Sequence, residues 1–198
     1  MKKMEYDFFA YLSRMKYIAR WSLMRSTERE NIQEHSHMAA VLAHALGLIR
    51  REVYGLDCDA ETLAAAALYH DAPEILTGDL PTPIKYHSRS IKTAYDEVED
   101  VAVTKLLSGL PEPLRPAYQR LLNGDLPPED RALLKAADTL SAYIKCVEER
   151  RAGNREFLSA EAASLQKLTA MALPEVEYFL ENFLPGFEKN LDELETLE

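Results

Sequence analysis

The sequence is poor in cysteine, glycine and long apolar runs. Two cysteines, Cys58 and Cys146, cannot supply the disulfide framework of a small secreted domain, and we expect both to be buried free thiols. The N-terminus lacks the apolar core of a signal peptide. No apolar run approaches the length of a membrane span. These absences predict a cytoplasmic protein with no membrane partner.

Positive charge is also scarce. The chain has 23 lysines and arginines against 33 aspartates and glutamates, which gives a formal net charge of −10 and a pI near 5.1. A surface of that sign repels a nucleic-acid backbone or an anionic membrane, so neither is an expected partner. A small anionic substrate would need local compensation by a metal ion or an arginine.

Helical periodicity is what the sequence does contain. Hydrophobic residues make up 47% of the chain and glycines number only 7, and the apolar positions recur at helical spacing without strand alternation. The expected helices span residues 7–18, 31–51, 59–77, 88–108, 112–122, 127–152, 154 onward and 174–184. Asn31 and Asp59 suit N-caps, Pro73 should loosen the third helix and Gly78 should end it. We therefore predict an all-α protein in which residues 1–198 form one domain.

One stretch, residues 68–85, concentrates ionisable groups at a predicted helix end. It holds His70, Asp71, Glu74 and Asp79. The glutamate lies one turn beyond the histidine and the first aspartate, so these three should point toward one region. Pro81 and Pro83 should keep the following chain in a loop. The stretch is either a metal-and-water site or the end of a surface helix with ordinary polar residues.

Two other predicted helices each carry a polar group on or beside an apolar stripe. His35 continues the stripe of Met38 and Leu42, and Asp138 sits beside the apolar stripe of the 127–152 helix. Alone, His35 is typical of a hydrogen-bonded core residue, and Asp138 of a partner for Lys135 or Lys145. With His70 and Asp71, however, they make two imidazoles and two carboxylates on three helices. That mixed N/O donor set suits a divalent transition ion.

Arg20 and Trp21 follow the first predicted helix. Such a pair is common in packing, where the indole covers a core edge and the guanidinium stays in water. The alternative is an anion clamp beside a flat apolar wall, which suits a nucleotide.

Together these motifs resemble the HD-domain phosphohydrolase superfamily, whose pattern is a histidine, a later His-Asp pair and a final aspartate on separate helices. More closely, the chain is similar to the bacterial 5′-deoxynucleotidase family. The similarity runs through RMKYIARWSLMR (14–25), NIQEHS (31–36), YHDAPE (69–74), TGDLPTPIKY (77–86) and KAADTLSAYIKCVEE (135–149). It covers nearly the whole chain and weakens over residues 110–130 and after residue 171.

The resemblance implies an HD-domain helical bundle over residues 1–198 and a bound divalent ion, namely cobalt, manganese or another transition metal. The metal ligands that it implies are His35, His70, Asp71 and Asp138. The substrate contacts that it implies are Arg20, Trp21, His35, Asp79, Leu80, Pro81 and Thr82, and the catalytic residues are Glu74, Arg20 and Asp79. Whether Glu74 or Asp79 handles the protons stays open.

The activity implied by the resemblance is hydrolysis of deoxyribonucleoside 5′-monophosphates to deoxynucleosides and phosphate, by in-line attack of a metal-activated water. The implied assembly is a homodimer. One alternative is another HD-type phosphohydrolase, acting on guanosine polyphosphates or cyclic nucleotides. The other is a non-catalytic helical protein that binds nucleotides and uses the metal structurally.

Overall fold

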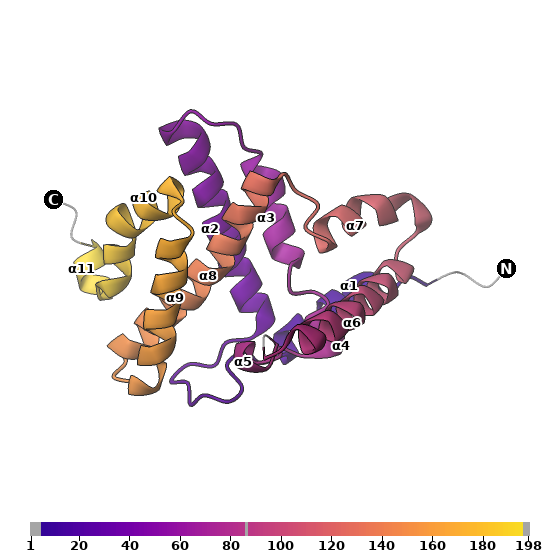
Figure 1. Ribbon diagram of the computed structural model, residues 1–198, viewed down its shortest axis with the longest axis horizontal. Helices are drawn as coiled ribbons and strands as arrows, with labels where there is room; N and C mark the ends of the chain where they lie inside the picture. Colours follow the sequence, from indigo (N-terminus) through magenta and orange to yellow (C-terminus); the bar gives the residue numbers. More distant parts are fainter. Residues whose placement is uncertain (1–4, 86, 196–198) are drawn as a thin grey trace.

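The computed structural model describes residues 5–85 and 87–195, which form a helical assembly (Figure 1). Its α-helices are α1 (Phe8–Leu12), α2 (Ile32–Leu48), α3 (Ala60–Tyr69), α4 (Glu74–Thr77), α5 (Thr82–Lys85), α6 (Arg89–Ser108), α7 (Arg115–Leu122), α8 (Pro128–Arg151), α9 (Leu158–Ala170), α10 (Pro174–Asn182) and α11 (Leu191–Glu195). The shorter pieces are the 3-10 helices η1 (Met15–Tyr17), η3 (Glu112–Leu114), η4 (Arg155–Phe157) and η5 (Leu184–Glu188), and the π-helical turn η2 (Ile49–Val53). The only β-type pairing in these residues is an isolated bridge between Ala19 and Asn31. The prediction of an all-α protein is confirmed.

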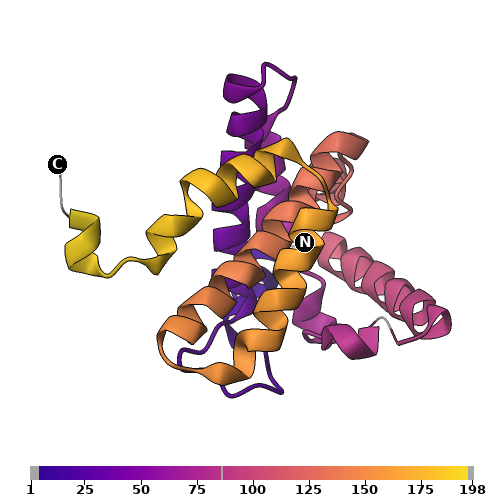
Figure 2. The ribbon, with the colours of Figure 1, turned by 60° about the vertical axis from the view of Figure 1, so that its left-hand side comes forward.

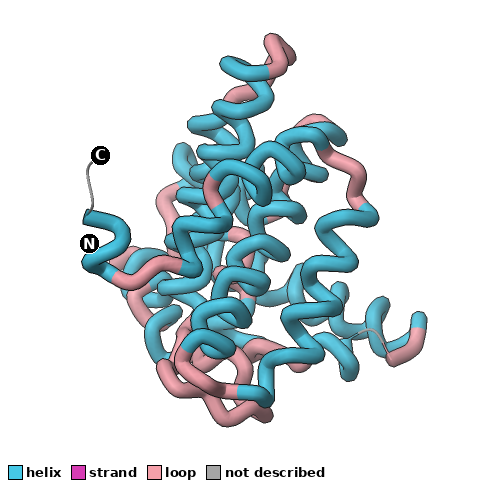
Figure 3. Tube along the Cα trace, turned by 90° about the vertical axis from the view of Figure 1, so that its left-hand side faces the viewer, coloured by secondary structure: helices cyan, strands magenta, loops and turns pink. Residues whose placement is uncertain are grey.

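The main core lies between α2, α3 and α8, at the centre of Figure 1. Leu42, Leu63 and Leu140 are among the side chains buried there. A Cβ atom at Gly47 of α2 would lie 2.8 Å from the Cβ of Ala60, so glycine is what allows α2 and α3 to approach this closely. α9 runs beside α8 on its outer side (Figure 2). Short loops join most of the helices (Figure 3). Packing in the main core fixes the central parts of α2, α3 and α8 relative to one another.

A second, smaller core joins α1, α6 and α7 on the right of Figure 1. Phe8, Leu106 and Leu110 are completely or almost completely buried in it, and Ala72, from the turn between α3 and α4, belongs to the same cluster. The segment that follows His70 is therefore packed against this second core. The two cores meet at the end of α3, where the predicted site lies.

Local capping places the helix starts as predicted. The Asn31 side chain accepts hydrogen bonds from the backbone N–H groups of Gln33 and Glu34. In return, the Glu34 side chain accepts one from the Asn31 N–H. Asp59 caps α3 in the same way through Thr62 N–H. Gly78 ends α4 at φ 75°, a backbone conformation that glycine adopts more easily than other residues.

Two predicted helices are broken. The first, expected over residues 7–18, splits into α1 and η1. Its end is drawn into extended pairing, because Ile18 O accepts from Ile32 N–H at 3.0 Å. The helix expected over residues 59–77 splits into α3 and α4. Pro73 explains this break. In a continuous helix its ring would clash with the carbonyl group of Tyr69, the residue at which α3 ends.

Two further predictions were wrong. Residues 82–85 form the single turn α5 where a loop was expected, because a proline in a first helical turn loses no hydrogen bond. In α6 the helical spacing of Ile91, Ala94, Val98, Val101 and Leu106 predicts that these five residues form the buried face, but of these only Leu106 is buried. The face that meets the rest of the molecule instead carries Tyr95, Glu99 and Ala102, as polar contacts to α4 and α5 set the rotation of this helix.

Both cysteines are buried free thiols, as predicted. None of the helices in the described ranges is long and apolar enough to cross a membrane.

Candidate active site

Three helices bring together the histidines and aspartates expected to bind metal. His35 lies in the first turn of α2, His70 directly follows α3, and Asp138 lies in the middle of α8. Nε2 of His35 is 3.0 Å from Oδ1 of Asp138 and 3.5 Å from Oδ2 of Asp71. Nε2 of His70 is 3.2 Å from Oδ1 of Asp71 and 3.8 Å from Oδ1 of Asp138. One potential ligand atom from each of His35, His70 and Asp138 lies within 4.8 Å of the others.

The Nδ1 atom of each imidazole, which points away from the aspartates, is hydrogen-bonded to the protein. His70 Nδ1 donates to the carbonyl of Ala67 at 2.7 Å, so the lone pair of the neutral ring is on Nε2. His35 Nδ1 pairs with the hydroxyl of Ser141 at 3.1 Å. Both rings are thereby oriented with Nε2 toward the two aspartates, the arrangement that metal-binding histidines usually have.

The cluster has a surplus of negative charge. Burial would lower the pKa of His70, but the carboxylates of Asp71 and Asp138 outweigh it and raise that pKa to about 9. Desolvation would raise the pKa of Asp138, but the hydrogen bond with His35 and the charges of the two histidines hold it well below its ordinary value. The Asp138 side chain is still 43% exposed, so solvent reaches the cluster from one side.

These residues fit a divalent metal ion. His70 Nε2 is buried and makes no hydrogen bond within the described residues, because its approaches to the two carboxylates have the wrong direction or length. An orphaned buried nitrogen is costly unless a ligand satisfies it. Two imidazoles with carboxylate oxygens form a donor set suited to zinc and its neighbours in the first transition row.

Arg20 reaches the cluster from the loop before α2. Its Nη1 donates to Oδ2 of Asp71 at 3.2 Å and its Nε to Oε2 of Glu30 at 3.3 Å. Within the described residues, Nη2 has no protein acceptor. Burial would lower the pKa of Arg20, but the surrounding carboxylates, Asp71 first among them, raise it. A guanidinium held along one edge can still offer the other edge to an anion.

Trp21 stands next to this arginine in a strained conformation. Its φ is 56°, a region that bulky side chains rarely adopt. Its indole Nε1 donates to Oε2 of Glu30 at 2.9 Å, and its ring meets that of Phe157 edge-on with 5.3 Å between centroids. Glu30 was not predicted as a site residue, yet the same oxygen accepts from both Arg20 and Trp21. No local sequence pattern pairs residues ten positions apart in a loop.

Glu74 and Asp79 approach the cluster from α4 and the loop after it. Burial and the charges of Asp71 and Asp79 raise the pKa of Glu74 to about 9. Burial likewise raises the pKa of Asp79, although Arg20 opposes it. Oε2 of Glu74 is buried and has no hydrogen-bond partner among the described residues. The charge of Asp71 therefore acts on the Glu74 carboxyl group although α3 and α4 are separate helices.

The remaining predicted substrate residues follow Asp79. Leu80 and Pro81 are partly buried in that loop, and Thr82 begins α5 with a side chain that lies outside the described residues. Their contact with a substrate stays a prediction. Ser141, by contrast, was not predicted as a functional residue, although it lies one turn after Asp138 on the same face of α8.

The chain is similar to characterised groups of proteins over nearly its full length. The profile of the YfbR-like 5′-deoxynucleotidase family matches residues 7–187. A protein of Yersinia pestis (strain Pestoides F) named 5′-deoxynucleotidase is 46% identical over 188 residues, covering 94% of this chain and 95% of that protein. A Yersinia pseudotuberculosis protein (serotype O:3, strain YPIII) of the same name is equally similar, with 46% identity, 94% of this chain and 95% of that protein covered.

Solved structures share the fold. An HD-domain phosphohydrolase from Listeria innocua superposes with a TM-score of 0.80 at 25% identity, covering 93% of this chain and 90% of that one. The HD phosphohydrolase DatZ of cyanophage S-2L, solved with dA and one catalytic Zn²⁺ ion, has a TM-score of 0.65 at 20% identity, covering 91% of this chain and 96% of that one. The fold is thus an HD-type helical bundle, and with the profile match and the Yersinia relatives, this chain belongs to the YfbR-like 5′-deoxynucleotidase family.

Proposed function

We propose that the protein is a metal-dependent 5′-deoxynucleotidase that hydrolyses deoxyribonucleoside 5′-monophosphates to deoxynucleosides and phosphate. The observation that carries the proposal is the buried Nε2 of His70, which has no hydrogen-bond partner among the described residues and faces Asp71 and Asp138 beside His35. Family membership supports the reaction, since the relatives at 46% identity carry the name 5′-deoxynucleotidase.

The proposed metal ligands are His35, His70, Asp71 and Asp138, and the ion is cobalt, manganese or another divalent transition metal. Such an ion, when bound, supplies a water of lowered pKa and neutralises charge on a phosphate oxygen.

The protein's own residues would bind and orient the phosphate. Nη2 of Arg20 would hold a non-bridging phosphate oxygen, while Glu30 and Asp71 keep the guanidinium in place. Water would attack phosphorus in line, the bond to the nucleoside 5′-oxygen would break, and that oxygen would take a proton. Glu74 would orient or deprotonate the water, and Asp79 would either hold a sugar hydroxyl or assist the leaving group. The proposed nucleotide contacts are Arg20, Trp21, His35, Asp79, Leu80, Pro81 and Thr82.

The direct test measures free phosphate released from a panel of deoxynucleotides, ribonucleotides, guanosine polyphosphates and cyclic nucleotides. We expect turnover of deoxynucleoside monophosphates, loss of turnover on chelation, and recovery with Mn²⁺ or Co²⁺. His70→Ala should bind less metal, measured directly on the protein, and lose several kcal/mol of transition-state stabilisation, on the order of a thousandfold in rate.

A control is His37→Ala, which removes an exposed histidine from α2, the helix that carries the proposed ligand His35. It should retain both metal and activity. Full activity in thoroughly chelated protein would rule out the metal mechanism, and turnover restricted to cyclic nucleotides or guanosine polyphosphates would rule out the substrate.

We also propose a homodimer in the cytoplasm, on the strength of the family resemblance. Light scattering after size-exclusion chromatography tests the assembly, and a monomeric mass at micromolar concentration would contradict it.

A further inference from the structure

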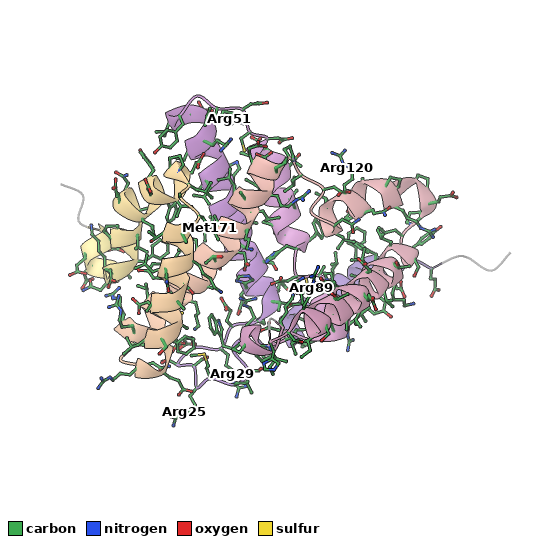
Figure 4. The ribbon with its side chains drawn as sticks, viewed as in Figure 1. Arg25, Arg29, Arg51, Arg89, Arg120 and Met171 are labelled. Carbon is green, nitrogen blue, oxygen red and sulfur yellow. The ribbon has the colours of Figure 1, made fainter. Side chains whose placement is uncertain are left out.

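The loop that carries Arg20 and Trp21 is closed at its base by backbone pairing. Ala19 and Asn31 form the isolated bridge, and Arg20 N–H donates to Glu30 O at 2.9 Å. This 19–31 loop, which we define by these residues, runs past the C-terminal end of α8 and the η4 turn that precedes α9. Arg25 and Arg29, both on the loop, are labelled at the lower edge of the molecule in Figure 4. This pairing fixes only the two ends of the loop, so its middle part needs other contacts.

A buried carboxylate at the end of α8 holds it. The side chain of Glu149 is 1% exposed, and its two oxygens accept hydrogen bonds from four donors. Two are backbone N–H groups of the loop, from Thr27 at 2.8 Å and Glu28 at 3.2 Å. The others are Lys145 Nζ at 2.6 Å and Asn154 Nδ2 at 2.8 Å. All four partners donate, so a carboxylate satisfies them together and an amide cannot.

The two side-chain donors extend the attachment. Lys145 Nζ also donates to the carbonyl of Glu28 at 2.7 Å, and Asn154 Nδ2 to the carbonyl of Arg25 at 2.7 Å. The backbone of the loop is thus bonded at Arg25, Thr27 and Glu28 to groups centred on Glu149. Hydrogen bonds to a buried ionised group are stronger than neutral ones.

The strain at Trp21 explains why such an attachment is needed. A left-handed conformation is unfavourable for a bulky residue and persists only where the surroundings determine it. The ring of Trp21 lies against Phe157, three residues after Asn154. The indole and the far part of the loop are therefore held at the same end of the molecule.

We propose that Glu149 is a positioning residue, which fixes the 19–31 loop so that Arg20 and Trp21 meet the nucleotide in one geometry and discriminate its sugar. The inference rests on the proposed function for its kinetic readout. It also has a readout that does not depend on activity, because Trp21 is the only tryptophan in the chain.

The test compares Glu149→Gln with the wild type. The substitution keeps the shape but turns an NH₂ group toward donors, so the loop should loosen. We expect the Trp21 emission to shift to longer wavelength and its quenching by acrylamide to increase. The kcat/KM for a deoxynucleotide should fall about tenfold, and the deoxy-to-ribo ratio of kcat/KM should fall at least about threefold, because the wall and the clamp move.

Glu161→Gln is the matched control. The Glu161 carboxylate accepts from Arg150 Nε at 3.0 Å through both oxygens, and Arg150 is the residue next to Glu149. Among the described residues, Glu161 makes no hydrogen bond or ion pair with the 19–31 loop. This variant should keep wild-type emission, quenching and substrate ratio. Equal changes in both glutamine variants would overturn the proposal, since general destabilisation would then account for them.

Asn154→Asp keeps the test decisive if Glu149→Gln does not fold. An aspartate retains the oxygen that accepts from Glu156 N–H at 3.1 Å but sets a carboxylate against Glu149. We expect the same changes on a smaller scale. Unchanged emission, quenching and ratio in a folded variant of either residue would overturn the proposal. If the wild type released no phosphate from any deoxynucleotide, the proposed function would fail, and Trp21 fluorescence would still decide the role of Glu149.

Discussion

Two segments flank the His–Asp cluster, and they are held in different ways. The 19–31 loop, with Arg20, is attached through the ion pair of Lys145 and Glu149, whose side chains are 8% and 1% exposed. The 78–85 segment, with Asp79, is attached to α6 through the pair of Lys85 and Glu99, whose side chains are 20% and 28% exposed. The hydroxyl of Tyr95, also on α6, donates a further hydrogen bond to the carbonyl of Gly78.

This difference sets how firmly each segment is held. Removing a partner from the buried Glu149 network leaves desolvated donors unsatisfied, which is costly. A partly exposed pair such as Lys85–Glu99 contributes about 1 kcal/mol or less. The 19–31 loop is therefore suited to be a fixed wall that tests the shape of the substrate. The 78–85 segment can yield at small cost, which suits a part that admits the nucleotide and releases the product.

The comparison predicts the largest loss for a change to Arg20, the proposed phosphate-binding group of the 19–31 loop. Arg20→Lys should lower kcat at saturating deoxynucleotide by one to two decades, because an ammonium cannot satisfy Glu30 and Asp71 and also bind a phosphate oxygen. The measurement is steady-state turnover with circular dichroism to check folding. Wild-type kcat in a folded Arg20→Lys protein would remove the phosphate role from this loop.

The second prediction concerns Trp21 as the wall. Trp21→Ala should lower the deoxy-to-ribo ratio of kcat/KM about tenfold, mainly by gained activity on ribonucleotides. A pocket can reject an added hydroxyl by only about a hundredfold. The measurement pairs dAMP with AMP at one metal concentration.

Trp21→Phe separates the wall from the bond to Glu30. Phenylalanine keeps an aromatic face near Phe157 but cannot donate to Glu30. It should keep most of the ratio if the wall decides discrimination. If Trp21→Ala lowers both activities equally, discrimination belongs to the 78–85 segment instead.

The parts that sequence could predict are those determined locally. Asn31 with Glu34 predicted the start of α2, and the apolar stripe on the same helix placed His35 inside, where it is completely buried. Gly78 marked the end of α4, and Pro73 marked the weak point of the predicted 59–77 helix, because their backbone restrictions act within one turn. The cluster could be inferred because each of its members had its own reason to face inward.

The parts that sequence could not predict depend on distant partners. Glu149 contacts residues more than a hundred positions away, and the pairing of Ile18 with Ile32 ends a helix that periodicity would have continued. In α6 two stripes compete, and the polar residues Tyr95 and Glu99 prevail over Val98 and Val101, because α4 and α5 offer them partners. Hydrophobic periodicity gives no weight to such contacts.

The third prediction tests the electrostatics of the fixed loop. Burial would raise the pKa of Glu149, but hydrogen bonds from Lys145, Thr27 and Asn154 lower it from 4.5 to about 2. A group with a lowered folded pKa stabilises the fold above its unfolded pKa, and this contribution is lost as pH falls through 4.5 toward 2.

Urea unfolding of wild type and Glu149→Gln at a series of pH values measures this contribution. The difference in unfolding free energy should be largest above about pH 5 and shrink toward pH 3. The Glu161→Gln control should show a much weaker trend, because the ion pair of Glu161 with Arg150 is partly exposed to solvent. A difference for Glu149→Gln that stays constant with pH would mean that the carboxylate charge does not hold the loop.

The smallest effect is expected from a change to the attachment of the 78–85 segment. The hydroxyl of Tyr95 lies 3.2 Å from Oγ1 of Thr77 and donates to the carbonyl of Gly78 at 3.4 Å, directly before Asp79. Tyr95→Phe keeps the ring under Lys85 Nζ, which lies 4.4 Å from its centroid, and removes only these neutral bonds. Such bonds are worth about 1 kcal/mol, so KM for a deoxynucleotide should rise no more than about fivefold. The deoxy-to-ribo ratio should not change, because the wall in the 19–31 loop is untouched. A Tyr95→Phe protein that lost sugar discrimination as Trp21→Ala is expected to would reverse the assignment of the two segments, making the segment on α6 the selective one.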